Sequence, residues 1–266
     1  MTQGFFRVHI VDNGSTDGTR EYLATLHDPR VTVIALARNM GVSVAANVGW
    51  AADEEASFYV KLDNDIEILK GDWLRCLLEY AADSKLGMVG YRFLKKHTIT
   101  ELKLANGSLF WDFSSCGGAC CCISQAVHQK LGFWNEDYGH YGFEDLEYGQ
   151  RCRLLNLMTG YLPYEDRVRH LGYTKRDEQY EIKKQTDLEQ ISGKKMYFIN
   201  KLLFEQKIRP LKVTRRYLPY EGTYPLRFKP NPAYHSILLL LNELQKTVPY
   251  TREKDIVSLD LSKWKQ

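Results

Sequence analysis

Long hydrophobic runs are absent from this chain of 266 residues. A membrane-spanning helix needs roughly 18 to 20 consecutive apolar residues, whereas the run Ile237–Leu241 has only five. The N-terminus also lacks the basic-then-apolar pattern of a secretory signal. We therefore expect a cytoplasmic protein. Ile237–Leu241 either packs on the main domain or docks on a membrane surface as part of an amphipathic helix, which would make the protein peripheral.

Cysteine pairs with the spacing of metal ligands are also absent. Four of the six cysteines lie between Cys116 and Cys122, and none forms a CxxC pair. This pattern fits neither a disulfide framework nor a zinc ribbon. Adjacent cysteines on a strand point to opposite faces, and buried free cysteine behaves as a small hydrophobic residue.

A strong excess of one charge is missing as well, because the net charge is only +3. Apolar residues make up 44% and charged residues 26%, as is usual for a soluble globular protein. The charge is uneven, with 16 Lys/Arg against 7 Asp/Glu in residues 167–229. This basic half either contacts an anionic partner, such as a membrane surface, nucleic acid or another anionic polymer, or is an ordinary solvated surface.

The first half of the chain alternates short β-rich runs with helical patterns, which predicts an α/β fold with a mostly parallel sheet flanked by helices. Polar residues end several of the strands, at the edge where open α/β sheets bind ligands. The expected strands are 7–11, 31–35, 58–62 and 87–93, and the expected helices are 19–26, 42–53 and 72–82.

The pattern becomes irregular from Glu101 to Ser124 and resumes with a helix at 144–155 and a short strand at 161–163. After His170 we expect a long polar helix over 177–206 and an amphipathic helix over 233–246. The predicted domains are therefore a catalytic domain, residues 1–173, and a mainly helical C-terminal extension, residues 174–266.

Two strand-to-helix corners carry polar residues. In the first, Asp12 ends a strand and Gly14 permits a tight turn. Asp12 can accept hydrogen bonds from a base or ribose, or it simply forms the turn. The second corner contains Asn39 and Gly41 and leads into a helix with Asn47 among small residues, which indicates either close approach of a ligand or tight packing.

A pair of carboxylates follows the apolar strand 58–62. Asp63 and Asp65 are one residue apart, and strand alternation places them on one side. Two like charges held this close repel each other, so a divalent cation between them and a diphosphate would stabilise the arrangement. Hard oxygen ligands suit Mg²⁺ or Mn²⁺, and this DXD motif therefore predicts a metal site.

A further acidic group opens the helix at 144–155. Glu144 and Asp145 lie at its N-terminus, where the helix dipole favours negative charge. They are either an ordinary charged first turn or include a catalytic base. His170 either completes the metal site through an imidazole nitrogen or is structural.

In this order, the motifs resemble glycosyltransferase family 2 of the GT-A fold, over roughly residues 6–173. They read DNGSTDGT, NMGVSVAAN, LDND, GGAC and GFEDLEYGQR, followed by His170. The resemblance implies inverting transfer from a nucleotide-sugar donor. The implied roles are base contact for Asp12, nucleotide contact for Asn39, Gly41 and Asn47, ribose and metal contact for Asp63, metal ligands Asp65 and His170, donor-sugar contact for Gly118 and Ala119, the base Asp145, and substrate contact for Glu144.

The chain departs from the family pattern at its start. Family members normally carry a further strand and helix ahead of the first motif, but Met1 precedes Asp12 by only eleven residues. Either this unit is absent or another segment supplies the strand. Residues 212–220 and the helix at 233–246 have the right order for a permuted copy, although Arg215 and Arg216 suit a buried central strand badly.

Together these features predict a metal-dependent enzyme of polysaccharide biosynthesis that moves a sugar from UDP or dTDP. The expected acceptor is a hydroxyl on a glycan, a lipid-linked sugar or another polymer. The alternatives are a sugar-phosphate nucleotidyltransferase and a non-catalytic module that binds nucleotide sugars or glycans.

Overall fold

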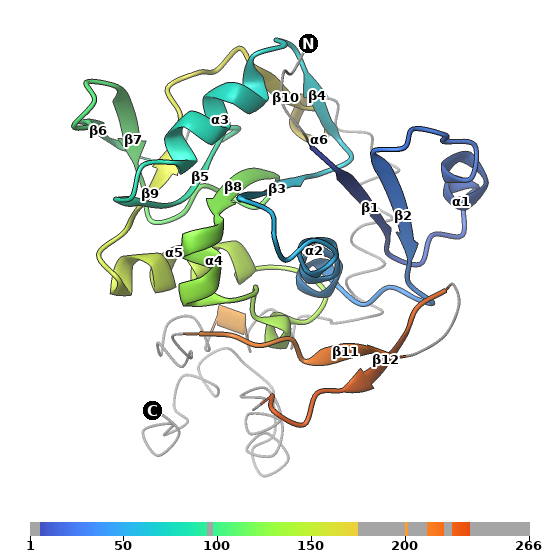
Figure 1. Cartoon of the computed structure of the whole chain (residues 1–266). Helices are drawn as coiled ribbons and strands as arrows, with labels where there is room; N and C mark the ends of the chain where they lie inside the picture. Colours follow the sequence, from blue (N-terminus) through green and yellow to red (C-terminus); the bar gives the residue numbers. More distant parts are fainter. Residues whose placement is uncertain (1–5, 95–97, 175–199, 202–211, 221–224, 235–266) are drawn as a thin grey trace, which may run out of the picture. The chain divides into compact units, whose positions relative to one another are not determined.

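The computed structural model describes residues 6–94, 98–174, 200–201, 212–220 and 225–234, which fall into two compact units (Figure 1). The six-stranded unit contains the described residues of 55–132 and 145–174. The β1–β2 unit contains those of 6–54, 133–144 and 200–234. Each unit is described below by itself.

A mixed sheet forms the centre of the six-stranded unit, in the order β3-β8-β5-β9-β7-β6. β5 and β9 are parallel, and the other neighbouring pairs are antiparallel. β3, β5, β9 and β6 consequently run in one direction, against β8 and β7. The strands are β3 (Phe58–Leu62), β5 (Leu86–Gly90), β6 (Thr100–Lys103), β7 (Leu109–Asp112), β8 (Cys120–Ser124) and β9 (Met158–Tyr161).

Helices cover this sheet on both faces. α3 (Trp73–Ala81) packs on β5 and β8 through a core that includes Leu77, Leu86 and Cys122. α5 (Glu144–Leu154) approaches through Gly87, where a Cβ would lie 2.6 Å from Cys152 Sγ. α4 (Gln125–Leu131) follows β8 directly. These two layers explain why β5 is buried throughout.

A short antiparallel sheet in the same unit joins β4 (Ile66–Ile68) to β10 (Val168–His170). β4 begins just after β3, and β10 leads into α6 (Leu171–Thr174). The register pairs Ile66 with His170, so residues about a hundred positions apart in the sequence become neighbours.

In the β1–β2 unit, β1 (Val8–Asp12) and β2 (Val31–Ala35) are parallel and in register from Val8–Val31 to Asp12–Ala35. α2 packs on them through a small core that contains Leu36 and Val44. The other elements are α1 (Thr19–Leu23), α2 (Val42–Ala51), the 3₁₀ helix η1 (Glu136–Tyr138), β11 (Tyr217–Tyr220) and β12 (Arg227–Pro230).

The α/β class and most of the expected elements are confirmed, because their apolar spacing was clear. The strands at 31–35 and 58–62 have the predicted bounds, and the others shift by a few residues. The expectation of irregular structure over 101–124 was wrong, since β7 and β8 lie there with most of β6. Glycine and serine residues around these strands obscure them in the sequence, and β7 and β8 also pair with strands far along the chain.

The C-terminal part differs from the predicted helical extension. Its described residues contain the hairpin of β11 and β12, and backbone hydrogen bonds join Phe133 to Val213 (3.1 Å) and Leu226 to Ala35 (3.0 Å). The division into domains at residue 173 stays a prediction. The helices expected at 177–206 and 233–246 lie outside the described residues, apart from their last or first few positions.

The proposed permuted strand is also corrected. β11 pairs with β12 in an antiparallel hairpin, and among the described residues β1 pairs with β2 alone. Arg215 and Arg216 precede this hairpin, as expected from their poor fit to a buried strand. No helix in the described part of the chain has the length and apolar character to cross a membrane.

Candidate active site

The two carboxylates after β3 have different partners. Asp63 continues the pairing of β3 with β8, because its N–H donates to the Ala119 carbonyl (2.8 Å), and its side chain accepts a hydrogen bond from Lys61. Asp65 instead turns toward β10 and α6, where its carbonyl accepts from Leu171 N (2.8 Å). The two carboxylates of the predicted pair are therefore close in sequence, but each contacts a different element of the fold.

Asp65 and His170 lie side by side, as the metal prediction requires. His170 Nδ1 is 3.5 Å from Asp65 Oδ2, and the ring of Phe93 meets the imidazole edge-on at 5.3 Å. A glycine follows closely at position 172, where a Cβ would come within 2.9 Å of Asp65 Oδ2 and 3.0 Å of His170 Cε1. Only glycine leaves this space beside the two side chains open.

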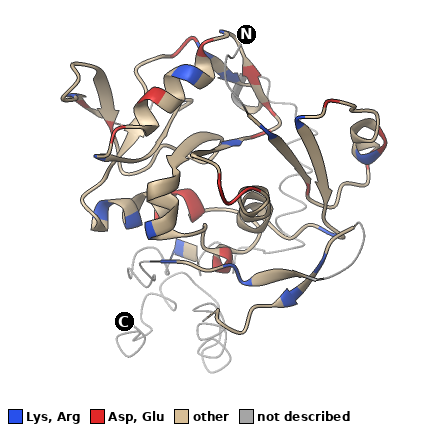
Figure 2. Ribbon diagram, in the orientation of Figure 1, with Lys and Arg blue, Asp and Glu red and all other residues tan. Residues whose placement is uncertain are grey.

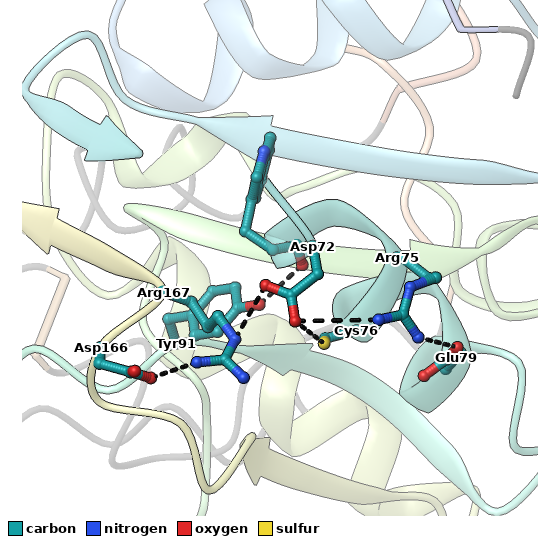
Figure 3. A network of polar contacts seen from close by, with 8 residues as sticks. Asp72, Arg75, Cys76, Glu79, Tyr91, Asp166 and Arg167 are labelled. Atoms are coloured by element: carbon teal, nitrogen blue, oxygen red, sulfur yellow. Dashed lines mark hydrogen bonds and ion pairs between the residues drawn. The ribbon is translucent and has the colours of Figure 1, made fainter. Parts of the chain in front are cut away.

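A polar network joins the start of α3 to the residues just before β10 (Figure 3). The Arg167 guanidinium binds Asp72 (Nε to Oδ1, 3.0 Å) and Asp166 (2.5 Å), and its backbone carbonyl accepts from Leu69 N. Asp72 opens α3, so the network connects that helix to the segment that leads into β10. The pairing of β10 with β4 then brings His170 opposite Ile66.

Asp145 lies against the segment Ser115–Ala119. Ser115 Oγ donates to the Asp145 carbonyl (3.0 Å), and the Asp145 carboxylate accepts from Leu146 N (2.7 Å). Burial raises the pKa of Asp145, while hydrogen bonding by the backbone of Leu146 and Gly118 and the positive charge of Lys61 oppose the rise. A carboxyl whose pKa is raised in this way is suited to accept a proton near neutral pH.

The helix that carries Asp145 is anchored by a buried ion pair. Glu147 and Arg151 are both fully buried, with Arg151 Nε 3.0 Å from the carboxylate, and Arg151 also donates to the Leu131 carbonyl. Glu144, the predicted substrate contact, is buried at 6% exposure. Phe143, immediately before the helix, has a φ of +73°, and such strain in a bulky residue is concentrated at functional sites.

In the β1–β2 unit, Asp12 stabilises the first strand-to-helix corner through hydrogen bonds. Its side chain is fully buried and accepts from Ser15 N (3.0 Å) and Arg20 Nε (2.6 Å). Arg20 also donates to the Leu36 carbonyl (2.7 Å) at the end of β2. Burial pushes the pKa of Asp12 upward, but the bonds from Ser15 and Arg20 outweigh it and the pKa is lowered. This gives Asp12 a structural role, and its contact with a base stays a prediction.

The two corners are joined through Asn13. Its amide donates to Asn39 Oδ1 (3.1 Å) and to the Gly41 carbonyl (3.2 Å), while its oxygen accepts from Met40 N (2.8 Å). Gly41 has a φ of +92°, and a Cβ there would collide with the Gly139 carbonyl. Asn39 is exposed. The structure thus brings the predicted nucleotide contacts Asn39 and Gly41 to one place.

Asn47 is fully buried, and its predicted contact with the nucleotide stays a prediction. Its amide donates to the Trp134 carbonyl (2.9 Å) and Glu136 Oε1 (2.8 Å), and its oxygen accepts from Trp134 N (2.9 Å). Every one of these bonds is internal. The alternative interpretation of this helix, tight packing, is the one that Asn47 fits.

A sequence model described as glycosyl transferase family 2 matches residues 2–131. The match covers just under half of the chain. The matched residues include Asp12, Asn39, Asp63, Asp65 and the glycines before β8, whereas α5 and β10 follow them. The roles of Asp145 and His170 therefore stay predictions from the sequence pattern.

Among similar proteins is the low-salt glycan biosynthesis hexosyltransferase Agl10 of Haloferax volcanii. It is 24% identical over 196 residues, which cover 65% of this chain and 62% of the relative, so the chain spans less than two thirds of that protein. Two solved structures each have a TM-score of 0.49. They are GalNAc-T7 with UDP, GalNAc and Mn²⁺ (12% identity, 62% of this chain, 37% of that one) and the Pyrobaculum calidifontis mannosyltransferase PcManGT with GDP-Man and Mn²⁺ (19%, 67% and 51%).

The residues of this site fit a divalent cation at Asp65 and His170. Within the described ranges, no three His, Cys, Asp or Glu side chains converge as a complete metal site. A carboxylate and an imidazole nonetheless supply two ligands that suit Mn²⁺, and Gly172 keeps the space beside them open. Such a pair leaves further coordination positions for water and phosphate oxygens.

Sequence reasoning missed two side chains that contact the candidate site. Lys61 stands in the apolar strand β3, and a charged residue at a strand position with 13% side-chain exposure is a signal that could have revealed it. Arg167 entered the sequence analysis only as the start of the basic region 167–229. Its pairing with Asp72 depends on tertiary contact, so the sequence carries no local sign of it.

Proposed function

We propose that this chain transfers a glycosyl group from a nucleoside-diphosphate sugar to a hydroxyl acceptor, with inversion at the anomeric carbon. The match of residues 2–131 to glycosyl transferase family 2 supports the transfer, and the observation that carries the proposal is the environment of Asp145. This carboxylate has a raised pKa and lies beside Gly118 and near the charge of Lys61, which also binds Asp63. One cluster thus combines a base with the predicted donor-binding residues.

Asp145 acts on the acceptor. Its ionised carboxylate takes the proton of the acceptor hydroxyl as the oxygen forms a bond to the anomeric carbon. The bond from that carbon to the diphosphate oxygen breaks on the opposite side, and its electron pair leaves with the nucleoside diphosphate. A direct displacement of this kind inverts the configuration.

Asp65 and His170 would hold Mn²⁺ or Mg²⁺, with Asp63 close in sequence. When bound, the cation neutralises charge on the leaving diphosphate. Asp65 is in turn held by the backbone of Leu171, and His170 by the pairing of β10 with β4. These contacts orient the two ligands before any substrate arrives, which reduces the entropy lost on binding.

UDP or dTDP is the proposed nucleotide, and a glycan, lipid-linked sugar or other polymer is the proposed acceptor. The relative from Haloferax volcanii is a hexosyltransferase of glycan biosynthesis, so hexoses are the first donor sugars to test. The described basic residues near the C-terminal hairpin are partly neutralised, since Arg216 lies 3.7 Å from Asp137 (Figure 2). Contact with an anionic polymer or membrane surface, and a cytoplasmic location, are proposals that rest on the sequence.

The test is turnover of a panel of UDP-, dTDP- and GDP-hexoses with Mn²⁺, with and without sugar acceptors. We expect nucleotide release by the wild type and a loss of at least about 100-fold in Asp145→Asn, the usual contribution of a general base. Asp28→Asn, a carboxyl in a loop of the other unit, is the charge-matched control and should retain activity. Nucleotide binding without turnover across the panel would instead support a non-catalytic binding module.

A further inference from the structure

Lys61 is a charged residue in an otherwise apolar strand. Its neighbours on β3 are Val60 and Leu62, and its side chain is only 13% exposed. An ammonium group removed from water in this way is stable only when it is paired and hydrogen-bonded. The hydrogen-bond partners of Lys61 therefore indicate its role.

Those partners are two of the predicted donor-binding positions. The ammonium donates to Asp63 Oδ1 and to the Gly118 carbonyl (2.8 Å). Strand alternation places Lys61 and Asp63 on the same side of the chain. Asp63 N also donates to the Ala119 carbonyl, so side-chain and backbone bonds together hold the end of β3 to residues 118–119.

Gly118 connects Lys61 to the predicted base. Its carbonyl accepts from Lys61, and hydrogen bonding by its backbone lowers the pKa of Asp145. The positive charge of Lys61 also acts on Asp145 directly. A substitution of Lys61 would consequently affect both Asp63, just after β3, and Asp145, on α5.

We propose that Lys61 is a positioning residue, which holds Asp63 and the Gly118 peptide in the arrangement from which Asp145 acts on the acceptor. This inference rests on the proposed function for its catalytic meaning. Its structural content, the tie between Lys61 and Gly118, is independent of any activity. A lysine that merely filled a place in β3 would be replaceable by an apolar side chain of similar length.

Amide hydrogen exchange on the unliganded protein tests the tie first. Lys61→Met keeps the length of the side chain but removes its charge and its hydrogen-bond donors. Lys61→Arg keeps the charge and the donors. Lys130→Met, the control, changes an exposed lysine on α4. In Lys61→Met we expect exchange over residues 117–119 to rise at least about 10-fold, with exchange of β5 unchanged. Lys61→Arg and Lys130→Met should behave as the wild type.

Kinetics with the best donor of the panel test the consequence. Loss of a hydrogen bond to a charged group predicts a kcat roughly 10- to 100-fold lower in Lys61→Met, with KM for the acceptor changed less. Lys61→Arg should recover most of this loss.

The outcomes separate the two proposals. Unchanged exchange at 117–119 in Lys61→Met overturns the positioning role, whatever the activity. Equal acceleration of exchange throughout the unit also overturns it, because Lys61 would then serve stability alone. Local acceleration together with a wild type that turns over no donor refutes the proposed function and leaves the tie established. Local acceleration with unchanged kcat refutes the link to catalysis.

Discussion

The buried ion pair on α5 yields a stability prediction that can be worked out from the structure. Arg151→Met would remove the guanidinium from a fully buried site and leave the Glu147 carboxylate without its cation. Arg151 also donates to the Leu131 carbonyl and lies with its guanidinium carbon 4.6 Å from the centre of the Tyr148 ring. The substitution therefore loses three contacts at once while it keeps most of the side-chain volume.

Breaking a buried pair from one side costs about 3 to 5 kcal/mol, because the remaining charge is uncompensated. For a protein of this size each kcal/mol lowers Tm by roughly 2 to 4 °C, so the expected shift is roughly 6 to 20 °C. Removing both charges in Glu147→Gln/Arg151→Met should recover part of the loss, since the buried carboxylate is then absent.

The chain offers a matched control on α3. Arg75 and Glu79 have the same spacing of four residues, with Nη1 2.9 Å from Oε1, but their side chains are 64% and 58% exposed. An exposed pair of this kind contributes about 0.3 to 0.5 kcal/mol, so Arg75→Met should change stability very little. Urea unfolding followed by circular dichroism, with thermal melts alongside, measures both variants.

The comparison has a clear refuting result. If Arg151→Met were no more destabilising than Arg75→Met, the carboxylate of Glu147 would have to be satisfied without Arg151. If the double variant were less stable than Arg151→Met, the cost would come from packing and not from an unpaired charge. Either outcome would contradict the view that this ion pair anchors the helix of Asp145.

Three further predictions concern the site. Burial raises the pKa of Asp145, and the base must be ionised to accept a proton. Wild-type turnover should therefore fall as the pH decreases through this raised pKa, at a higher pH than an ordinary Asp would give. A pH profile of kcat with its acid limb below pH 4 would contradict this. Asp65→Ala and His170→Ala should each weaken Mn²⁺ binding in the presence of UDP at least about 10-fold, as measured by calorimetry. An affinity equal to that of the wild type in both variants would refute the assignment of these two residues as metal ligands. Asn47→Ala should cost about 3 kcal/mol in urea unfolding, since it leaves buried polar groups of Trp134 unpaired, with unchanged nucleotide affinity; a selective loss of affinity would support its binding role.

Much of the fold could be predicted because local sequence patterns decide it. The strand 58–62 is a short apolar run that ends in acids, and the periodic helices around 73–81 and 144–154 were found within a few residues. β6, β7 and β8 were not found. They are short and lie among glycines and serines, and part of their stability comes from partners such as β9, which lies almost fifty residues away from β7.

The site divides in the same way. The types and spacing of Asp63, Asp65 and Asp145 are visible in the sequence because the chemistry of a metal-diphosphate and a base requires carboxylates. Asn47 shows the limit of this reasoning, since an amide beside small residues looks the same whether it meets a ligand or Trp134. Only burial distinguishes the two, and burial depends on segments distant in the chain.

The sequence by itself determined the likeness to glycosyl transferase family 2, the α/β class and the order of the chemical groups, because these depend on residue type and local periodicity. The tertiary structure decided which groups meet. It placed His170 beside Asp65 through the pairing of β10 with β4, and it joined Lys61 to Asp63 and Gly118. Such contacts arise from strand register and packing between remote segments, which no local pattern of residues encodes.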